Sequence, residues 1–262
     1  INVILDVLFI VHLGWGVKGG AAATVIAQFV SMVIALVPLF KSKIFTWDLS
    51  YWRLEASLLK QMINLWLPMF VNSAVITIGG SFVSRNVNAI GPYFTAGISS
   101  GTKIFTMLES LIMAIQTGLS VFIGQNLGAG LKDRVKRGQH QVVLFGLTLA
   151  FVLNILVQSL APVLVGMFLS PSDPLYAQTL HVAVADVRVI TLGMFIMAPM
   201  YLYRIAIQTL GHPKYPMYAG FLQLLARVFS VSVLPVFIGE YGYYVATVLA
   251  WVVTLPVVMI PY

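Results

Sequence analysis

The chain has 262 residues, of which 60% are hydrophobic and only 9% are charged, and its formal net charge is +7. A soluble domain carries roughly 25% charged residues, so this composition predicts an all-α polytopic membrane protein. The sequence contains no cysteine, which excludes disulfides, thiolate metal sites and cysteine nucleophiles. The basic residues lie between apolar runs and are not interleaved with aromatic side chains, so we expect no nucleic-acid partner.

Eight apolar runs, separated by polar or glycine and proline breaks, predict eight transmembrane helices. They cover approximately 1–13, 19–40, 62–84, 94–122, 141–169, 178–205, 216–238 and 243–261. The first run starts at Ile1 without a basic flank, and we expect the sequence to be the C-terminal portion of a longer protein. The longest polar stretch, "KSKIFTWDLSYWRLEASLLK", predicts an amphipathic linker over 41–61, between two helices in 1–40 and six in 62–262.

Lysine and arginine favour the cytoplasmic side of a membrane protein, so their distribution predicts the orientation. One set of alternate connections holds Lys41, Lys43, Arg53, Lys60, Lys132, Arg134, Lys136, Arg137, Arg204 and Lys214. The opposite set holds Lys18 and Arg85. The linker is therefore predicted to be cytoplasmic, and the turns "LSPSDPLY" and "GEYGY" are predicted to lie outside.

A polar pair interrupts the first predicted helix. Asn2 and Asp6 are four residues apart and lie one turn above each other, with about 5–6 Å between their Cβ atoms. A carboxylate inside a bilayer costs about 2.5–3.5 kcal/mol, so Asp6 should face the interior of a helix bundle and have a partner. Thr24, near the outer start of the next helix, could add a hydroxyl. Three oxygen-bearing groups are suitable ligands for Na+, whereas an acid that gains and loses a proton suits H+. The alternative is that Asn2 and Asp6 only form a packing hydrogen bond between helices.

A second acid lies near the middle of the fourth predicted helix. Helical spacings of three, four and seven place it on one stripe made of Thr102, Thr106, Glu109, Met113 and Gln116. The stripe could line a substrate cavity or form a second acidic site, with Glu109, Thr106 and Gln116 as the candidate residues. The alternative is that Glu109 pairs with Lys103 or Arg227 for packing.

Three further features predict structure rather than chemistry. Asp186 and Arg188 are two residues apart and point to different faces, which favours interfacial anchoring or a structural ion pair. The stretch "GQNLGAG" at 124–130 has no following Lys-Ser/Thr and no preceding strand, which indicates a helix end and not a phosphate loop. The four histidines show no metal spacing, and no hydrolase motif is present, so we expect no enzyme and no cofactor.

An internal repeat occurs at an offset of 223 residues, where "GVKGGAAATVIA" (16–27) lies over "GEYGYYVATVLA" (239–250). The identical positions are Gly16, Gly19, Ala23, Thr24, Val25 and Ala27. The match pairs the second predicted helix with the eighth and indicates two similar six-helix halves, a layout common in transporters. The same offset places Asn2 over Leu225 and Asp6 over Phe229, so the polar pair belongs to one half alone.

Four segments in order resemble the bacterial branch of the multidrug and toxic compound extrusion (MATE) family. They are "NVILDVLFI", "GGAAATVIAQ", "FIGQNLGAGLKDRVKRG" and "IQTLGHPKYPMYAGFLQLLARV". The resemblance implies a twelve-helix, two-lobe exporter, of which this chain would supply the last two helices of the N-lobe and the whole C-lobe. It also implies that Asn2, Asp6 and Thr24 form the cation site of the N-lobe, which a further acid outside this chain would complete.

The function that follows from the resemblance is antiport of amphipathic or cationic organic compounds against Na+ or H+ in the bacterial cytoplasmic (inner) membrane. The expected partners are membrane lipid and small amphipathic substrates, and we expect a monomer. Two alternatives stay open: a lipid-linked precursor flippase of the same superfamily, and a membrane receptor or scaffold without transport activity.

Overall fold

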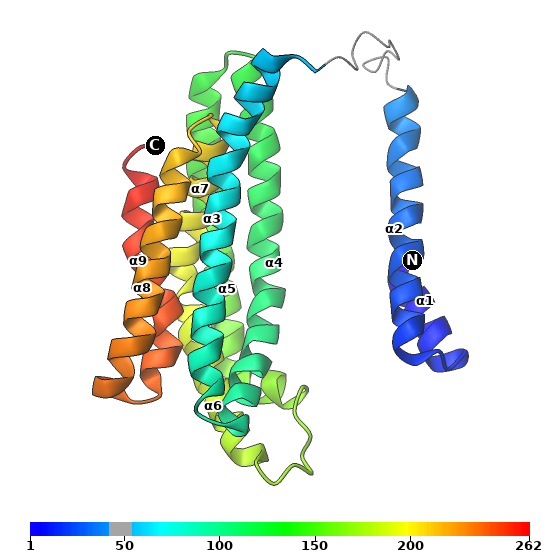
Figure 1. The fold of residues 1–262 in the computed structure, drawn as a ribbon, viewed down its shortest axis with the longest axis vertical. Helices are drawn as coiled ribbons and strands as arrows, with labels where there is room; N and C mark the ends of the chain where they lie inside the picture. The colour runs from blue at the N-terminus through cyan, green and yellow to red at the C-terminus, as the bar shows by residue number, and fades with distance from the viewer. Residues whose placement is uncertain (42–53) are drawn as a thin grey trace. The chain divides into compact units, whose positions relative to one another are not determined.

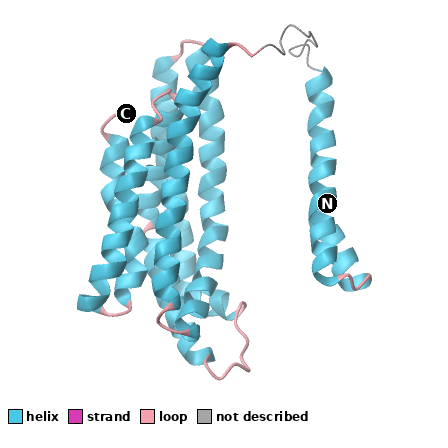
Figure 2. Ribbon diagram, in the orientation of Figure 1, coloured by secondary structure: helices cyan, strands magenta, loops and turns pink. Residues whose placement is uncertain are grey.

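The computed structural model describes residues 1–41 and 54–262, and these residues form helices and no strands (Figures 1 and 2). The chain divides into two compact units, Ile1–Leu59 and Lys60–Tyr262. Most of the predicted amphipathic linker, 42–53, lies outside the described residues. The assignment of the two units to two lobes stays a prediction.

Unit 1 is a helical hairpin. It consists of α1 (Asn2–Asp6), a π-helix η1 (Val7–His12) and α2 (Gly16–Lys41). Gly14 and Gly16 have φ angles of +64° and +53°, which only glycine adopts without strain, and they turn the chain between η1 and α2. The predicted helix over 1–13 is therefore an α-helical segment followed by a π-helical one.

Unit 2 is a bundle that packs around a buried apolar core. Its helices are α3 (Ala56–Asn88), α4 (Pro92–Gly128), α5 (Lys132–Gly166), α6 (Tyr176–Leu192), α7 (Met194–Thr209), α8 (Lys214–Ile238) and α9 (Tyr241–Met259). Phe105, Met194, Met197 and Trp251 lie in the main core, and the rings of Phe105 and Trp251 stack at 5.7 Å. Large apolar side chains also face outward, as expected of helices surrounded by lipid.

The predicted helix over 178–205 is broken into α6 and α7, which are bent by 49°. The break is at Gly193 and not at Pro199, which lies inside α7. A Cβ on Gly193 would lie 2.7 Å from Val248 Cγ2 and 2.8 Å from Trp251 Cζ3. Because Gly193 has no side chain, the bend between α6 and α7 can lie close to α9.

The prediction of an all-α, multi-pass membrane protein is confirmed. Six of the described helices are long and apolar enough to cross a membrane, and the bent α6–α7 pair makes a seventh if it counts as one span. The first predicted span corresponds to the shorter apolar segment Asn2–His12. The third predicted span starts too late, because α3 already begins at Ala56, inside the predicted linker.

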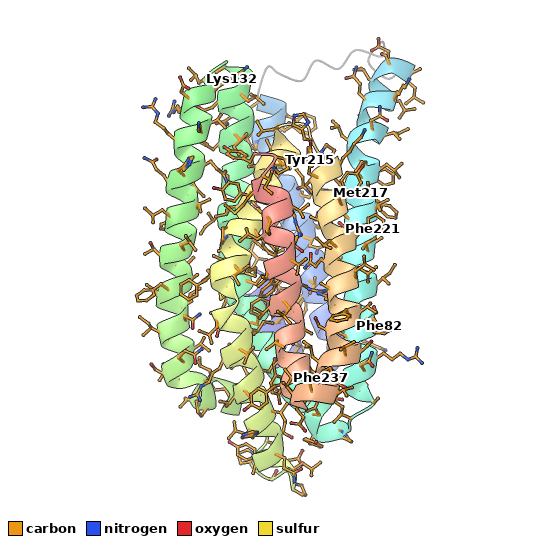
Figure 3. The ribbon with its side chains drawn as sticks, turned by 90° about the vertical axis from the view of Figure 1, so that its left-hand side faces the viewer. Phe82, Lys132, Tyr215, Met217, Phe221 and Phe237 are labelled. Carbon is orange, nitrogen blue, oxygen red and sulfur yellow. The ribbon has the colours of Figure 1, made fainter. Side chains whose placement is uncertain are left out.

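The two ends of unit 2 differ in charge. Figure 3 places Lys132 and Tyr215, from the starts of α5 and α8, toward one end and Phe237, from the end of α8, near the other. The basic connections predicted to be cytoplasmic therefore share one end of the unit. At this end "GQNLGAG" closes α4: Leu131 N–H donates to Asn126 O (2.8 Å) and Gly130, with φ +75°, donates to Leu127 O (3.0 Å). This double hydrogen bond is a helix C-terminal cap, as predicted.

Candidate functional site

Unit 1 brings the three predicted cation ligands onto facing sides of its hairpin. The Asn2 amide donates from Nδ2 to Thr24 Oγ1 over 3.4 Å, which joins α1 to α2. The Thr24 hydroxyl in turn donates to the carbonyl of Gly20, one turn earlier, over 2.9 Å. A Cβ on Gly20 would lie 3.8 Å from Asp6 Oδ1, so the carboxylate faces α2 at this level. Asp6 and Asn2 are half-buried and Thr24 is exposed within the described residues.

A change of helix type occurs directly after the acid. Asp6 ends α1, and η1 begins at Val7, with the wider hydrogen-bond pattern seen between Leu13 N and Leu8 O (2.9 Å). On α2, Gly19 receives η1 closely, since its Cβ would lie 3.0 Å from Phe9 Cβ. No pattern in the sequence predicted the π-helix, although the pair Gly19–Gly20 marks the close approach.

The chemistry available here is that of one carboxylate and two neutral oxygens. The Thr24 hydroxyl proton goes to Gly20 and the Asn2 N–H goes to Thr24, so the amide oxygen of Asn2 and the carboxylate of Asp6 stay available as acceptors. Hard cations prefer such oxygen ligands. A single negative charge would balance one Na+ or one proton.

The second predicted acid has a partner that the sequence did not reveal. Glu109 is half-buried on α4, and Tyr201 on α7 donates its hydroxyl to Glu109 Oε1 over 2.6 Å. Lys103, one of the two expected partners, instead places Nζ over the Phe168 ring at 5.7 Å from its centre. The other, Arg227, interacts with Glu109 electrostatically, and it lies against α3, where a Cβ on Gly79 would be 3.5 Å from its Cδ.

The hydrogen bond of Glu109 extends into a polar chain across three helices. Arg204, on the same helix as Tyr201, lies over the Tyr201 ring at 5.7 Å and donates to Gln223 Oε1 on α8 over 3.1 Å. Arg204 is buried. Glu109 thus belongs to a network between α4, α7 and α8, a connection that helical spacing within one segment cannot predict.

The other two candidate residues of the predicted stripe, Thr106 and Gln116, lie apart from this network. The Thr106 hydroxyl donates to the backbone carbonyl of Lys103 over 2.9 Å, within its own helix, and the residue is exposed. Gln116 is half-buried about two turns further along α4. The structure therefore places Glu109 in the bundle interior and Thr106 at its surface.

Asp186 and Arg188 do point to different faces of α6, and the predicted ion pair does not form between them, whereas the interfacial anchoring stays a prediction. Arg188 Nη2 donates to the carbonyl of Gln158 on α5 over 3.1 Å. Asp186 turns to α4, where a Cβ on Gly101 would lie 2.6 Å from its Oδ2, and it is 5% exposed. Spacing two on a helix separates the side chains by about 200°, which is why they find different neighbours.

Comparison with known proteins agrees with this architecture. A family model described as MatE matches residues 68–232. The probable multidrug resistance protein YoeA of Bacillus subtilis is 25% identical over 169 residues, covering 62% of this chain and 36% of the relative. The multidrug export protein MepA of Staphylococcus saprophyticus is 25% identical over 169 residues, covering 64% of this chain and 37% of the relative. The chain thus spans about a third of the length of these curated relatives.

Solved structures share the fold at low sequence identity. A MOP superfamily transporter from Pyrococcus furiosus superposes with a TM-score of 0.87 at 17% identity, covering 98% of this chain and 58% of the other. A variant of the Vibrio cholerae MATE transporter VcmN superposes with a TM-score of 0.85 at 17% identity, covering 98% and 57%.

Proposed function

The chain belongs to the MatE family, and from this we propose that it is part of a secondary active exporter, not an enzyme. The exporter would couple entry of a cation to extrusion of amphipathic, often cationic, organic compounds across the bacterial cytoplasmic membrane. In this proposal 1–40 supplies the last two helices of one lobe and 62–262 supplies the other lobe. The solved structures support this division, because 98% of this chain aligns with only 58% and 57% of the two transporter chains.

The names of the relatives favour drug export over lipid flipping. YoeA and MepA are named for multidrug resistance and multidrug export. The lipid-linked precursor flippase is therefore the less favoured alternative, and a receptor or scaffold has no support from these names. We expect membrane lipid and small amphipathic molecules as partners, a monomeric protein, and no cofactor beyond the coupling ion.

The observation that carries the coupling site is the link between α1 and α2. Asn2 reaches Thr24 across the hairpin, and Asp6 faces Gly20 one turn away, so three oxygen-bearing side chains converge from two helices. An intramembrane acid is costly and marks ion pathways. We assign Asn2, Asp6 and Thr24 as ligands of Na+ or, at Asp6, as the site of a carried proton. Binding and release at one carboxylate can bias a transporter between two states if the two states differ in ion affinity.

The test is export by the full-length protein under imposed Na+ and pH gradients. Asp6→Asn keeps the size and most hydrogen bonding but cannot carry a proton or balance Na+, so drug efflux should collapse while membrane insertion persists. Asn2→Ala and Thr24→Ala should weaken the ion dependence less, because each removes one neutral group and leaves the carboxylate.

The matched control is Phe229→Ala. Phe229 occupies the position of Asp6 in the other half of the repeat and is 61% exposed on α8, so its loss should leave coupling intact. Protein level is checked by blot for every variant. An Asp6→Asn protein that exports with unchanged ion dependence would return Asn2 and Asp6 to a packing role, and Glu109 would be the next acid to examine.

A further inference from the structure

A pocket of about 350 Å³ lies in unit 2, and its lining mixes apolar and polar side chains. It is formed by the end of α3, the start of α4, the middle of α6 and the start of α9, near the end predicted to face outside. Neutral oxygen-bearing side chains dominate its polar lining: Ser84, Asn88, Thr95, Ser99, Thr102 and Thr247. The acid in the lining is Asp186, and none of the lining residues is basic.

Asp186 is a buried carboxylate that lacks a full set of partners. The residue is 5% exposed, and its Oδ2 makes no hydrogen bond with any described residue. Arg188, the basic residue nearest in sequence, is committed to the Gln158 carbonyl on the other side of α6. Buried polar atoms are nearly always paired, and an unpaired carboxylate at this depth costs several kcal/mol. The orphaned oxygen therefore indicates a group that occupies the pocket in the working protein.

A second orphaned oxygen lies on the same pocket. The Tyr244 hydroxyl is buried and makes no hydrogen bond with the described residues, and the side chain is 2% exposed. The carboxylate of Glu240 acts on it electrostatically and accepts a hydrogen bond from Tyr93 over 3.1 Å. The surroundings of the pocket thus add negative charge, which favours a cation as the missing group.

The lining selects the class of cation. Hydroxyls such as Thr95, which donates to the Gly91 carbonyl over 3.1 Å, still offer their lone pairs to an ion. Oxygen ligands suit hard cations, and transition metals favour nitrogen and sulfur, which this pocket does not present as His, Cys or Met. One carboxylate balances one positive charge. The volume also exceeds the roughly 30 Å³ of a water molecule many times over, so the ion can keep part of its hydration shell.

The internal repeat gives this pocket a structural counterpart in unit 1. Gly239 and Gly16 both have positive φ, at +60° and +53°, at the turn that precedes the second helix of each hairpin. Eight residues after each glycine comes a threonine: Thr24, which receives the Asn2 amide, and Thr247, which lines the pocket of Asp186. Both hairpins therefore present a threonine hydroxyl at the same helical position, and the acid comes from a different helix in each unit.

We propose that the pocket lined by Asp186, Thr247 and Tyr244 binds a partly hydrated monovalent cation, with Na+ as its probe ion. It is a second cation site, within unit 2, and its occupancy does not require coupling at Asp6. Asp186 supplies the charge, and Thr247 and Tyr244 supply neutral oxygens.

The experiment measures binding of radioactive Na+ to the purified full-length protein in nanodiscs, with choline as the replacing cation. All variants carry Asp6→Asn, so that the α1–α2 site does not contribute. This background should retain saturable Na+ binding, and adding Asp186→Asn should abolish it. Thr247→Val and Tyr244→Phe should each weaken binding by about tenfold, the effect of losing one oxygen that contacts a charge. The control is Asp173→Asn, an acid of equal size whose Oδ1 accepts from Leu175 N in an exposed connection, and it should bind as the background does.

The proposal is overturned by the absence of saturable Na+ binding in the Asp6→Asn background, or by unchanged binding after Asp186→Asn. If Asp186→Asn fails to fold, unchanged affinity in both Thr247→Val and Tyr244→Phe has the same consequence. Proton uptake at Asp186 without Na+ binding also overturns it, because the acid would then be a proton site. Export by Asp6→Asn is a separate measurement, so the proposed function and this site can fail independently.

Discussion

At the scale of single residues, the three acids in the interior of the predicted spans have different environments. Asp6 lies beside neutral groups on α2, Glu109 accepts from a tyrosine, and Asp186 faces a pocket of hydroxyls. None of these three carboxylates is placed against an arginine or lysine side chain as its hydrogen-bond partner. Charges inside a membrane protein are expensive, so we expect different roles for these acids: ion binding at Asp6 and Asp186, and helix packing at Glu109.

Glu109 is the acid that we expect to be structural. Tyr201→Phe removes the hydroxyl that donates to Glu109 over 2.6 Å and should destabilise the protein by about 1 kcal/mol, a typical upper-range value for side-chain hydrogen bonds between membrane helices. The measurement is thermal unfolding of the purified full-length protein for Tyr201→Phe, Glu109→Gln and the double variant.

The double-mutant cycle isolates the pair from other effects of each substitution. Tyr203→Phe is the matched control, because Tyr203 lies on the same helix and makes an edge contact with the Tyr262 ring at 5.3 Å. A coupling energy near zero between Tyr201 and Glu109 would show that the hydrogen bond contributes nothing and would make Glu109 a candidate for transport chemistry.

At the scale of elements, the repeat predicted from the sequence corresponds to two helical hairpins with glycine contacts. In the first, a Cβ on Gly19 would meet Phe9 Cβ at 3.0 Å and the Phe9 carbonyl carbon at 3.1 Å. In the second, a Cβ on Gly242 would meet Pro235 N at 2.6 Å and the Leu234 carbonyl carbon at 2.8 Å. Small residues let helix backbones approach in membranes, where packing replaces the hydrophobic effect as the driving force.

The two glycines should therefore differ in their sensitivity to substitution. Gly242→Ala forces the α8 backbone to move and should cost about 1–3 kcal/mol, as other overpacking substitutions do. Gly19→Ala should cost less, because its contacts are longer by a few tenths of an ångström. Gly128→Ala, at a site with nothing within 4 Å, should be neutral or slightly stabilising. Thermal unfolding of the three variants gives the order, and equal losses for Gly19 and Gly242 would contradict it.

At the scale of the whole molecule, the sequence predicts the orientation of unit 2 in the membrane. The helix bundle determines which connections lie at the same end. The starts of α5 and α8 lie toward one end of unit 2, and the connection at 167–175 lies at the other end (Figure 1). Lysine and arginine concentrate at the first of these ends. The rule that positive connections stay in the cytoplasm then predicts which end faces outward.

Cysteine labelling tests this orientation, because this sequence contributes no background thiol. Ser172→Cys in the outer connection should react with a membrane-impermeant maleimide in intact cells. Lys136→Cys, in the first turns of α5, should react only in permeabilised cells or inverted vesicles. The two substitutions are on exposed residues, so neither should disturb folding. Labelling with the opposite pattern would reverse the assigned sides and place the Asp186 pocket at the cytoplasmic end.

The sequence by itself determined the class of protein, most of the helices and the family. Hydrophobic runs of span length carry this information locally, since each membrane helix satisfies its own backbone hydrogen bonds. The helix end at Gly130 and the divergence of Asp186 from Arg188 were also local, set by glycine and by helical geometry. The sequence also predicted that Asn2, Asp6 and Thr24 form one cation site, and their role stays a prediction.

Only the tertiary structure decided which groups meet across helices. The bend at Gly193, the Tyr201 partner of Glu109 and the pocket around Asp186 each join segments separated by tens of residues. Helical periodicity predicts which face a residue is on but not which neighbouring helix that face contacts, because helix packing depends on the sizes of side chains from both partners. For this reason Asp186, which spacing alone marked as a structural ion pair, became the acid of a candidate cation site.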